Sequence, residues 1–127
     1  MNNLINIFSI FILVLVLSCR SATPATPIKV DRYTVVIIEE TEARQFLPPS
    51  QLSAINSRVW RDYVSDHNGQ WRVLDPHTDV SKDEDWVRES LKADRSSLPW
   101  LIFSNKKTGG SMPMPENLEQ LMEKIKQ

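Results

Sequence analysis

The sequence predicts an α/β domain with a mixed sheet of about four strands and helices on both faces. Two continuous runs of β-branched and other apolar residues, 33–38 and 100–104, are typical of strands that are buried on both faces. Segments with apolar residues at helical spacing alternate with the strand-like runs, and one of them ends the chain. Because strands and helices alternate in this way, we expect a sheet layered between helices rather than a helical bundle or a β-sandwich.

The first half of the domain reads as strand, helix and strand. The first strand covers residues 33–38, and Pro48-Pro49-Ser50 opens a helix for which Ser50 is a candidate cap. This helix runs to Asn68-Gly69, and the second strand covers residues 71–75. Apolar residues mark one face of the helix: Leu52, Ile55, Val59, Trp60, Tyr63 and Val64.

The second half reads as helix, strand, hairpin and helix. Ser81-Lys82-Asp83-Glu84 has the form of a capping box and predicts that a helix begins there. The third strand covers residues 100–104, and residues 105–110 form a turn. Residues 111–114 predict an edge strand, since Pro113 cannot donate to a ladder. The last helix is marked by Leu118, Leu121, Met122 and Ile125.

The order of elements predicts the directions of the strands. Helical crossovers between strands of one sheet are right-handed, so we expect the first three strands to be parallel neighbours. The hairpin should add an antiparallel edge strand, and the last helix should cover one face of the sheet. On burial grounds Trp60, Trp86 and Trp100 should belong to the core, whereas Trp71 should be partly exposed.

The segment before the domain is typical of an exported protein with a lipid anchor. Residues 4–17 are apolar, too short for the roughly 20 residues of a membrane span, and fit a signal-peptide core. The only cysteine, Cys19, ends the sequence Val16-Leu17-Ser18-Cys19, which resembles the bacterial lipobox. The resemblance implies a signal peptide at 1–18 and a lipidated Cys19. It also implies a membrane-anchored lipoprotein of the bacterial cell envelope that faces the periplasm or the exterior.

A proline-rich tether joins the apolar segment to the folded domain. Residues 19–30 are rich in Pro, Thr and Ala and should hold the folded domain, residues 31–127, away from the membrane. An uncleaved N-terminal anchor remains open, because Met1-Asn2-Asn3 has no Lys or Arg, as a signal peptide would. A secreted protein also remains open, since an ordinary signal peptidase could cut within residues 21–25. The formal net charge of -1 argues against a nucleic-acid partner, which would require a basic face. No run of Lys or Arg predicts strong binding to anionic lipid either.

The element order, together with Ser97-Leu98-Pro99-Trp100-Leu101-Ile102-Phe103, resembles the thioredoxin-like family, whose fold is a three-layer sandwich. In that family a cis proline precedes the third core strand and faces the redox site, and a Gly-bearing hairpin and a C-terminal helix follow. Pro99, Gly109-Gly110 and residues 116–127 match this layout, and the resemblance covers residues 31–127. It implies that the Leu98–Pro99 bond is cis.

The redox chemistry of that family is excluded here. Family redox enzymes place Cys-x-x-Cys between the first of these strands and the next helix, where this chain has residues 39–49 and no cysteine. Dithiol exchange requires an attacking thiolate and a resolving thiol. Residues 35–38 are all aliphatic, so the strand also lacks the buried carboxylate that redox members have near their cysteines. The chain is therefore not a dithiol oxidoreductase.

A peptide-binding edge does not require cysteines. The resemblance implies that the backbone of Leu98 lies exposed next to the preceding loop, where an extended peptide can add as a strand. We therefore expect a membrane-tethered, redox-inactive domain that binds an unknown protein or extended peptide, with no cofactor and no catalytic residue. Arg44 would pair with a ligand carboxylate. The expected site comprises Leu98, Pro99, Glu42, Ala43, Arg44 and Gln45.

Two other functions remain open: an enzyme of unrecognised type that uses an acidic loop and His77, and a structural component of an envelope or virion. The acidic loop contains Glu39, Glu40 and Glu42, for which the simpler interpretation is a solvated strand end. Residues 75–79, Asp-Pro-His-Thr-Asp, alternate oxygen and nitrogen ligands, but Asp-Pro is typical of a turn and the segment lacks the features of a calcium loop. We therefore expect no metal site.

A hydrolase is the weakest of these alternatives. His67 or His77 could serve as a base for Ser97 or Ser104, but the sequence has no Gly-x-Ser-x-Gly elbow. With two histidines and many serines, their proximity would be a matter of chance.

Overall fold

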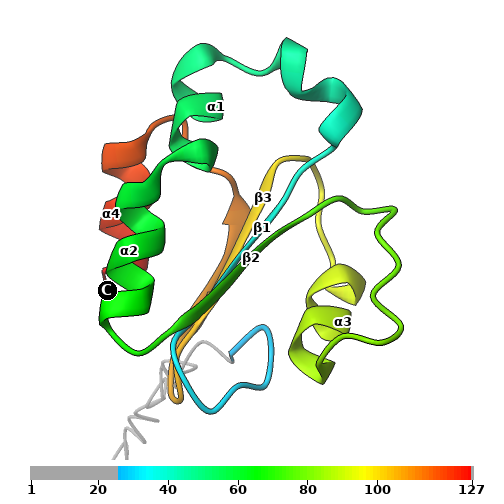
Figure 1. Ribbon diagram of the computed structural model, residues 1–127, viewed down its shortest axis with the longest axis vertical. Helices are drawn as coiled ribbons and strands as arrows, with labels where there is room; N and C mark the ends of the chain where they lie inside the picture. The colour runs from blue at the N-terminus through cyan, green and yellow to red at the C-terminus, as the bar shows by residue number, and fades with distance from the viewer. Residues whose placement is uncertain (1–25, 127) are drawn as a thin grey trace, which may run out of the picture.

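The computed structural model describes residues 26–126, which form a mixed sheet between two layers of helices (Figure 1). The sheet has the order β2-β1-β3-β4. Its strands are β1 (Thr34–Ile38), β2 (Gln70–Leu74), β3 (Trp100–Ser104) and β4 (Gly109–Pro113). The helices are the 3-10 helix η1 (Thr41–Phe46), α1 (Pro49–Asn56), α2 (Arg58–Asp66), α3 (Asp85–Lys92) and α4 (Leu118–Ile125). The predicted α/β class, the four-stranded mixed sheet and the helices on both faces are confirmed.

The alternating side chains of β1 divide the core into two halves. Val35 and Ile37 pack with α1, α2 and α4 on one face, where Trp60 is the largest fully buried side chain. Val36 and Ile38 pack with α3 on the other face, together with Ile28 from the start of the described chain. All five residues of β1 are buried, as expected for a central strand that is covered on both sides.

The prediction that the first three strands are parallel is wrong for β3. Strand β2 is parallel to β1, whereas β3 is antiparallel to β1 and pairs Ile38 with Trp100. The residues between β2 and α3 lead the chain back along the sheet, since Arg72 of β2 pairs with Asp83 at 3.2 Å. The segment after α3 then reaches the carboxyl end of β1, so β3 starts there and runs in the opposite direction (Figure 1). The antiparallel edge strand β4 and the position of α4 on one face are confirmed.

The single helix predicted after residue 48 is two helices. Ser57 ends α1 and caps α2, where its side chain accepts a hydrogen bond from the amide of Val59 at 3.1 Å. Because of the break, the apolar face of α2 does not continue that of α1. Trp60 is therefore buried, while Val59 is 54% exposed. Ser50 is not the cap of the first helix, because Pro48 occupies that position and Pro49 begins the helix.

The predicted capping box at residue 81 is also wrong. Helix α3 begins at Asp85, and Glu84 is its N-terminal cap. The Ser81 amide instead donates to the Asp79 side chain at 3.0 Å, within the loop that leads to α3. Of the four tryptophans, Trp60 and Trp100 are buried, whereas Trp71 and Trp86 are half-buried. Within residues 26–126, none of the helices is both long and apolar enough to cross a membrane.

Candidate functional site

A small cavity brings the segment before β3 against the loop that follows β1. It has a volume of about 80 Å³ and is lined by Glu40, Ala43, Leu47, Leu98 and Pro99. The Leu98–Pro99 peptide bond is cis, which confirms the expectation from the resemblance. Because Ile38 pairs with Trp100, Pro99 lies at the carboxyl end of β1, next to the start of the following loop. Leu98, Pro99 and Ala43 are therefore brought together as predicted.

The backbone of Leu98 is available at this edge. Its side chain is 38% exposed, and neither its amide nor its carbonyl has a hydrogen-bond partner within residues 26–126. The next residue differs, because the Pro99 carbonyl accepts the amide of Met114 at 3.0 Å. An unpaired backbone donor and acceptor next to the end of a strand is the arrangement to which another chain can add.

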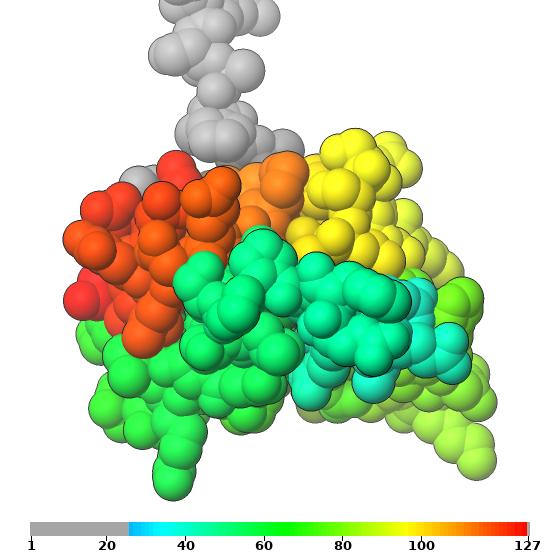
Figure 2. All heavy atoms as spheres, turned by 90° about the horizontal axis from the view of Figure 1, so that it is seen from above, coloured from blue at the N-terminus to red at the C-terminus, as the bar shows by residue number. Residues whose placement is uncertain are grey.

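The 3-10 helix η1 forms the other wall of the cavity and was not foreseen from the sequence. Its Ala43 and the following Leu47 face the cavity, whereas Glu42 and Gln45 are exposed and do not line it. Phe46 is 80% exposed, the largest exposed fraction of any large hydrophobic side chain among the described residues. Figure 2 shows the teal spheres of η1 adjoining the yellow spheres of the segment before β3. Phe46 and Leu47 are an apolar pair in a polar loop, a signal that could have identified this wall.

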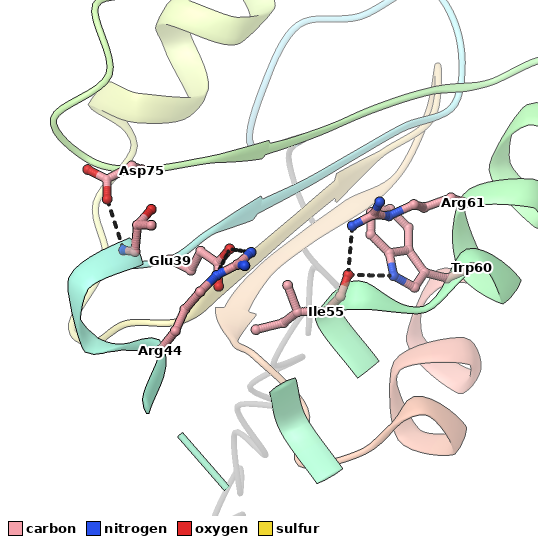
Figure 3. A network of polar contacts seen from close by, with 7 residues as sticks. Glu39, Arg44, Ile55, Trp60, Arg61 and Asp75 are labelled. Atoms are coloured by element: carbon pink, nitrogen blue, oxygen red, sulfur yellow. Dashed lines mark hydrogen bonds and ion pairs between the residues drawn. The ribbon is translucent and has the colours of Figure 1, made fainter. Parts of the chain in front are cut away.

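Arg44 pairs with Glu39 (Figure 3). Its Nε donates to Glu39 Oε1 at 2.9 Å, and its Nη2 contacts the same oxygen. This hydrogen bond raises the pKa of the Arg44 guanidinium above its ordinary value. The pair fixes η1 to the end of β1, and contact of Arg44 with a ligand carboxylate stays a prediction.

Glu39 is the buried partner in this pair. Its side chain is 3% exposed, so the interpretation of Glu39 as part of a solvated strand end is wrong. The sequence predicts no buried carboxylate in the aliphatic residues 35–38. Glu39, the next residue along the chain, supplies one directly after β1. Its Oε2 is buried without a hydrogen-bond partner among the described residues. The Arg44 contact is therefore what stabilises the charge of Glu39.

Glu40, which also lines the cavity, lies close to Asp75 and His77. His77 Nε2 lies 3.5 Å from Glu40 Oε2, and the possible ligand atoms of all three residues lie within 4.8 Å of one another. Asp75 accepts the amides of Thr41 and His77 at 2.9 and 2.8 Å, and these contacts lower the pKa of its carboxyl group. One divalent cation could be held here, but Asp79 is not part of the group.

The exposure of this group limits what it can do. The His77 side chain is 82% exposed, so water competes for its imidazole and for any bound ion. The Asp75 contacts instead have a structural role, because they join the loop after β2 to the first turn of η1 (Figure 3). The group therefore supports the wall of the cavity.

The residues considered for a hydrolase do not meet. The His67 ring packs on Tyr63, with ring centroids 4.1 Å apart, and its Nδ1 contacts the Tyr63 carbonyl at 2.7 Å. Ser104 is buried, and within residues 26–126 no hydrogen bond joins either histidine to Ser97 or Ser104. Cys19 lies outside the described residues.

No family model, curated protein or solved structure matches this chain. The function of the site therefore has to be argued from its geometry.

Proposed function

We propose that the chain is a redox-inactive, thioredoxin-like domain that binds an extended peptide at the Leu98–Pro99 edge and is tethered to a membrane. The observation that carries this proposal is the free backbone of Leu98 next to a small apolar cavity. The peptide would pair with Leu98 through main-chain hydrogen bonds and place one side chain in the cavity. The partner is a protein or peptide rather than a nucleic acid, because the net charge is -1.

The likeness to the thioredoxin-like family has structural support. The element order is β-α-β-α-β-β-α once α1 and α2 are taken as the interrupted first helix. Pro99 directly precedes β3 and faces η1 across the cavity. Family redox enzymes have their cysteines in the position of η1, opposite this proline. In this chain apolar side chains from Ala43 and Leu47 take that place, which suits packing against a ligand and not electron transfer.

The cavity indicates which peptide side chain the site accepts. Its volume of about 80 Å³ and its apolar walls of Ala43, Leu47, Leu98 and Pro99 suit a small aliphatic side chain. Glu40 lies at its margin, and the Arg44 charge is already compensated by Glu39. A peptide with an acidic residue beside the aliphatic one should therefore bind less well than one with a basic residue in that place.

Substitution of Ala43 by tryptophan tests this site. Peptides are first selected from a random display library against the parent chain, and the dissociation constant of the best one is measured by calorimetry. Ala43→Trp fills the cavity and should weaken binding by at least about tenfold, which is 1.4 kcal/mol. Gln45→Trp is the matched control, because it adds the same side chain on the exposed side of η1 and should leave binding unchanged. Equal affinities of Ala43→Trp and the parent, with both folded by circular dichroism, would refute the proposal.

The membrane tether is the second part of the proposal. It rests on Val16-Leu17-Ser18-Cys19 after an apolar segment and before a Pro-rich one. In a bacterial host, mass spectrometry of the purified protein should find an N-terminus at Cys19 with attached acyl groups. Cys19→Ser should leave the protein unacylated, either unprocessed or soluble, whereas Ser18→Ala, which keeps a small residue before the cysteine, should behave as the parent. An intact N-terminus with a free Cys19 thiol would contradict the anchor.

A further inference from the structure

Cations from distant parts of the sequence gather at the end of the domain that lies opposite the candidate site. Arg32, Lys106 and Lys107 line a hollow of about 650 Å³, and Lys126 lines an adjoining hollow of about 220 Å³. All four side chains belong to exposed residues. We call Arg32, Lys106, Lys107 and Lys126 the tether-end surface. The linear sequence does not reveal it, because the cations come from the segment before β1, the β3–β4 turn and the residue after α4.

The charge of this surface is largely uncompensated. Within residues 26–126 none of its four cations forms an ion pair. Arg32 is held by a neutral partner, since its Nε and Nη2 donate to Gln70 Oε1 at 3.0 and 2.8 Å. Asp31 is the only carboxylate that lines the two hollows, whereas Glu84 and Asp85 line a third hollow next to Arg32. Lys106, Lys107 and Lys126 lie outside that third hollow, so the two hollows have a net positive charge in a chain whose total charge is -1. An anionic partner is therefore expected here.

The start of the described chain lies at this same end. Pro27 packs against Gly109, since a Cβ on Gly109 would lie 2.9 Å from Pro27 Cδ. Gly109 directly follows the turn that carries Lys106 and Lys107. Six residues lie between Cys19 and Thr26, and the seven residue steps that join them reach at most about 25 Å when fully extended. A lipid on Cys19 would therefore keep the tether-end surface close to the membrane.

We propose that the tether-end surface binds the phosphate headgroups of anionic lipids in the membrane that anchors Cys19. The proposal rests on the anchor proposed above and adds an orientation to it. Thr34 pairs with Ser104 at this end of β1, and Ile38 pairs with Trp100 at the other end. The candidate peptide site therefore lies beyond the far end of β1, about 17 Å or more away, and would face away from the bilayer.

A membrane fits this surface better than other polyanions do. A flat bilayer contacts one end of the molecule, where the cations are. A nucleic acid would follow the surface further and meet the acidic groups that give the chain its negative total charge. Contacts with anionic lipid fall off within a Debye length, about 8–10 Å, so only groups on the membrane-facing end take part.

The test uses the full-length chain with Cys19→Ser, so that binding to vesicles is reversible. Its partition coefficient is measured by sedimentation with vesicles of phosphatidylcholine and with vesicles in which part of the lipid is phosphatidylglycerol. Binding to the neutral vesicles measures any contribution from residues 4–17. The ratio of the coefficient with phosphatidylglycerol to that with neutral vesicles measures binding by the tether-end surface. Each cation near an anionic bilayer raises the partition coefficient about fivefold. Lys106→Gln/Lys107→Gln should therefore lower the ratio by up to about 25-fold. Lys82→Gln/Lys92→Gln removes the same charge from the α3 side and should leave the ratio unchanged.

Three results would overturn the proposal that the tether-end surface binds anionic lipid. A ratio near one for the Cys19→Ser chain, or an equal loss in the two double variants, would overturn the proposal. If inorganic phosphate abolishes the preference for phosphatidylglycerol at constant ionic strength, the surface binds free phosphate and the proposal is also overturned. Acylation of the parent chain is measured separately by mass spectrometry, so failure of the anchor and failure of the surface are distinguishable.

Discussion

Replacing Trp60 by alanine is expected to lower the free energy of unfolding by about 4 kcal/mol. The Trp60 side chain is fully buried, and its ring packs edge-on against Trp71 with centroids 5.5 Å apart. Its Nε1 also donates to the carbonyls of Ala54 and Ile55 at 3.0 and 3.3 Å, at the break between α1 and α2. Figure 3 shows the contact with Ile55. The loss therefore combines a large cavity with the loss of the hydrogen bonds from Nε1 to these two carbonyls. Denaturant unfolding followed by circular dichroism measures it.

A phenylalanine variant separates these two contributions. Trp60→Phe keeps most of the buried ring but removes the Nε1 donor, so it should cost about 1–3 kcal/mol. The loss should lie at the low end of this range, because Arg61 still donates to the Ile55 carbonyl at 3.0 Å and the Ser57 amide still donates to the Ala54 carbonyl at 3.2 Å. Val59→Ala serves as the control on the exposed side of α2 and should change stability by less than about 0.5 kcal/mol. A similar small effect for Trp60→Ala would contradict the packing described here.

Replacing Arg44 by methionine is expected to lower the free energy of unfolding by about 3 kcal/mol, because it leaves the buried Glu39 carboxylate without a partner. This expected loss of stability lies at the low end of the range for broken buried ion pairs, since the Arg44 side chain is 38% exposed. The same substitution should loosen η1 and weaken peptide binding, because η1 supplies Ala43 to the cavity. Unfolding by denaturant at neutral pH measures the first effect, and calorimetry with the selected peptide measures the second.

The double variant Glu39→Gln/Arg44→Met is the informative control for this pair. Removing the charge from position 39 should recover more than half of the lost stability, because no buried carboxylate then remains. Arg58→Met removes an arginine from an exposed position and should have little effect. If the double variant is no more stable than Arg44→Met alone, the stranded charge is not the cause of the loss.

The sequence predicted the elements of this fold better than their directions. Strand β3 and the start of α4 are where the apolar patterns place them, because a buried strand and an amphipathic helix leave local signals. The direction of β3 has no local signal: it depends on the path of the chain between β2 and α3, which returns along the sheet. The break at Ser57 was missed because Leu52, Ile55 and Val59 keep helical spacing across it.

The candidate site was predicted only in part, because some of its contacts leave no local signal in the sequence. Leu98, Pro99 and Ala43 were expected together and line one cavity. The roles of Glu39 and Arg44 were not predicted, because a charged residue after a strand usually points to solvent. Burial of Glu39 follows from the way η1 folds over the end of β1, and a pattern of single residues does not encode such a contact. The tether-end surface was missed because its cations are far apart in the sequence.

Strand addition at the backbone of Leu98 is tested most directly by the exchange rate of the Leu98 amide proton. The full chain is labelled with nitrogen-15 and studied by nuclear magnetic resonance, with and without the selected peptide. Strand addition predicts that the Leu98 amide becomes strongly protected from exchange on binding and shows cross-relaxation with backbone protons of the peptide. Saturating peptide that leaves the Leu98 amide exchanging at its free rate, while protecting amides elsewhere, would contradict the account.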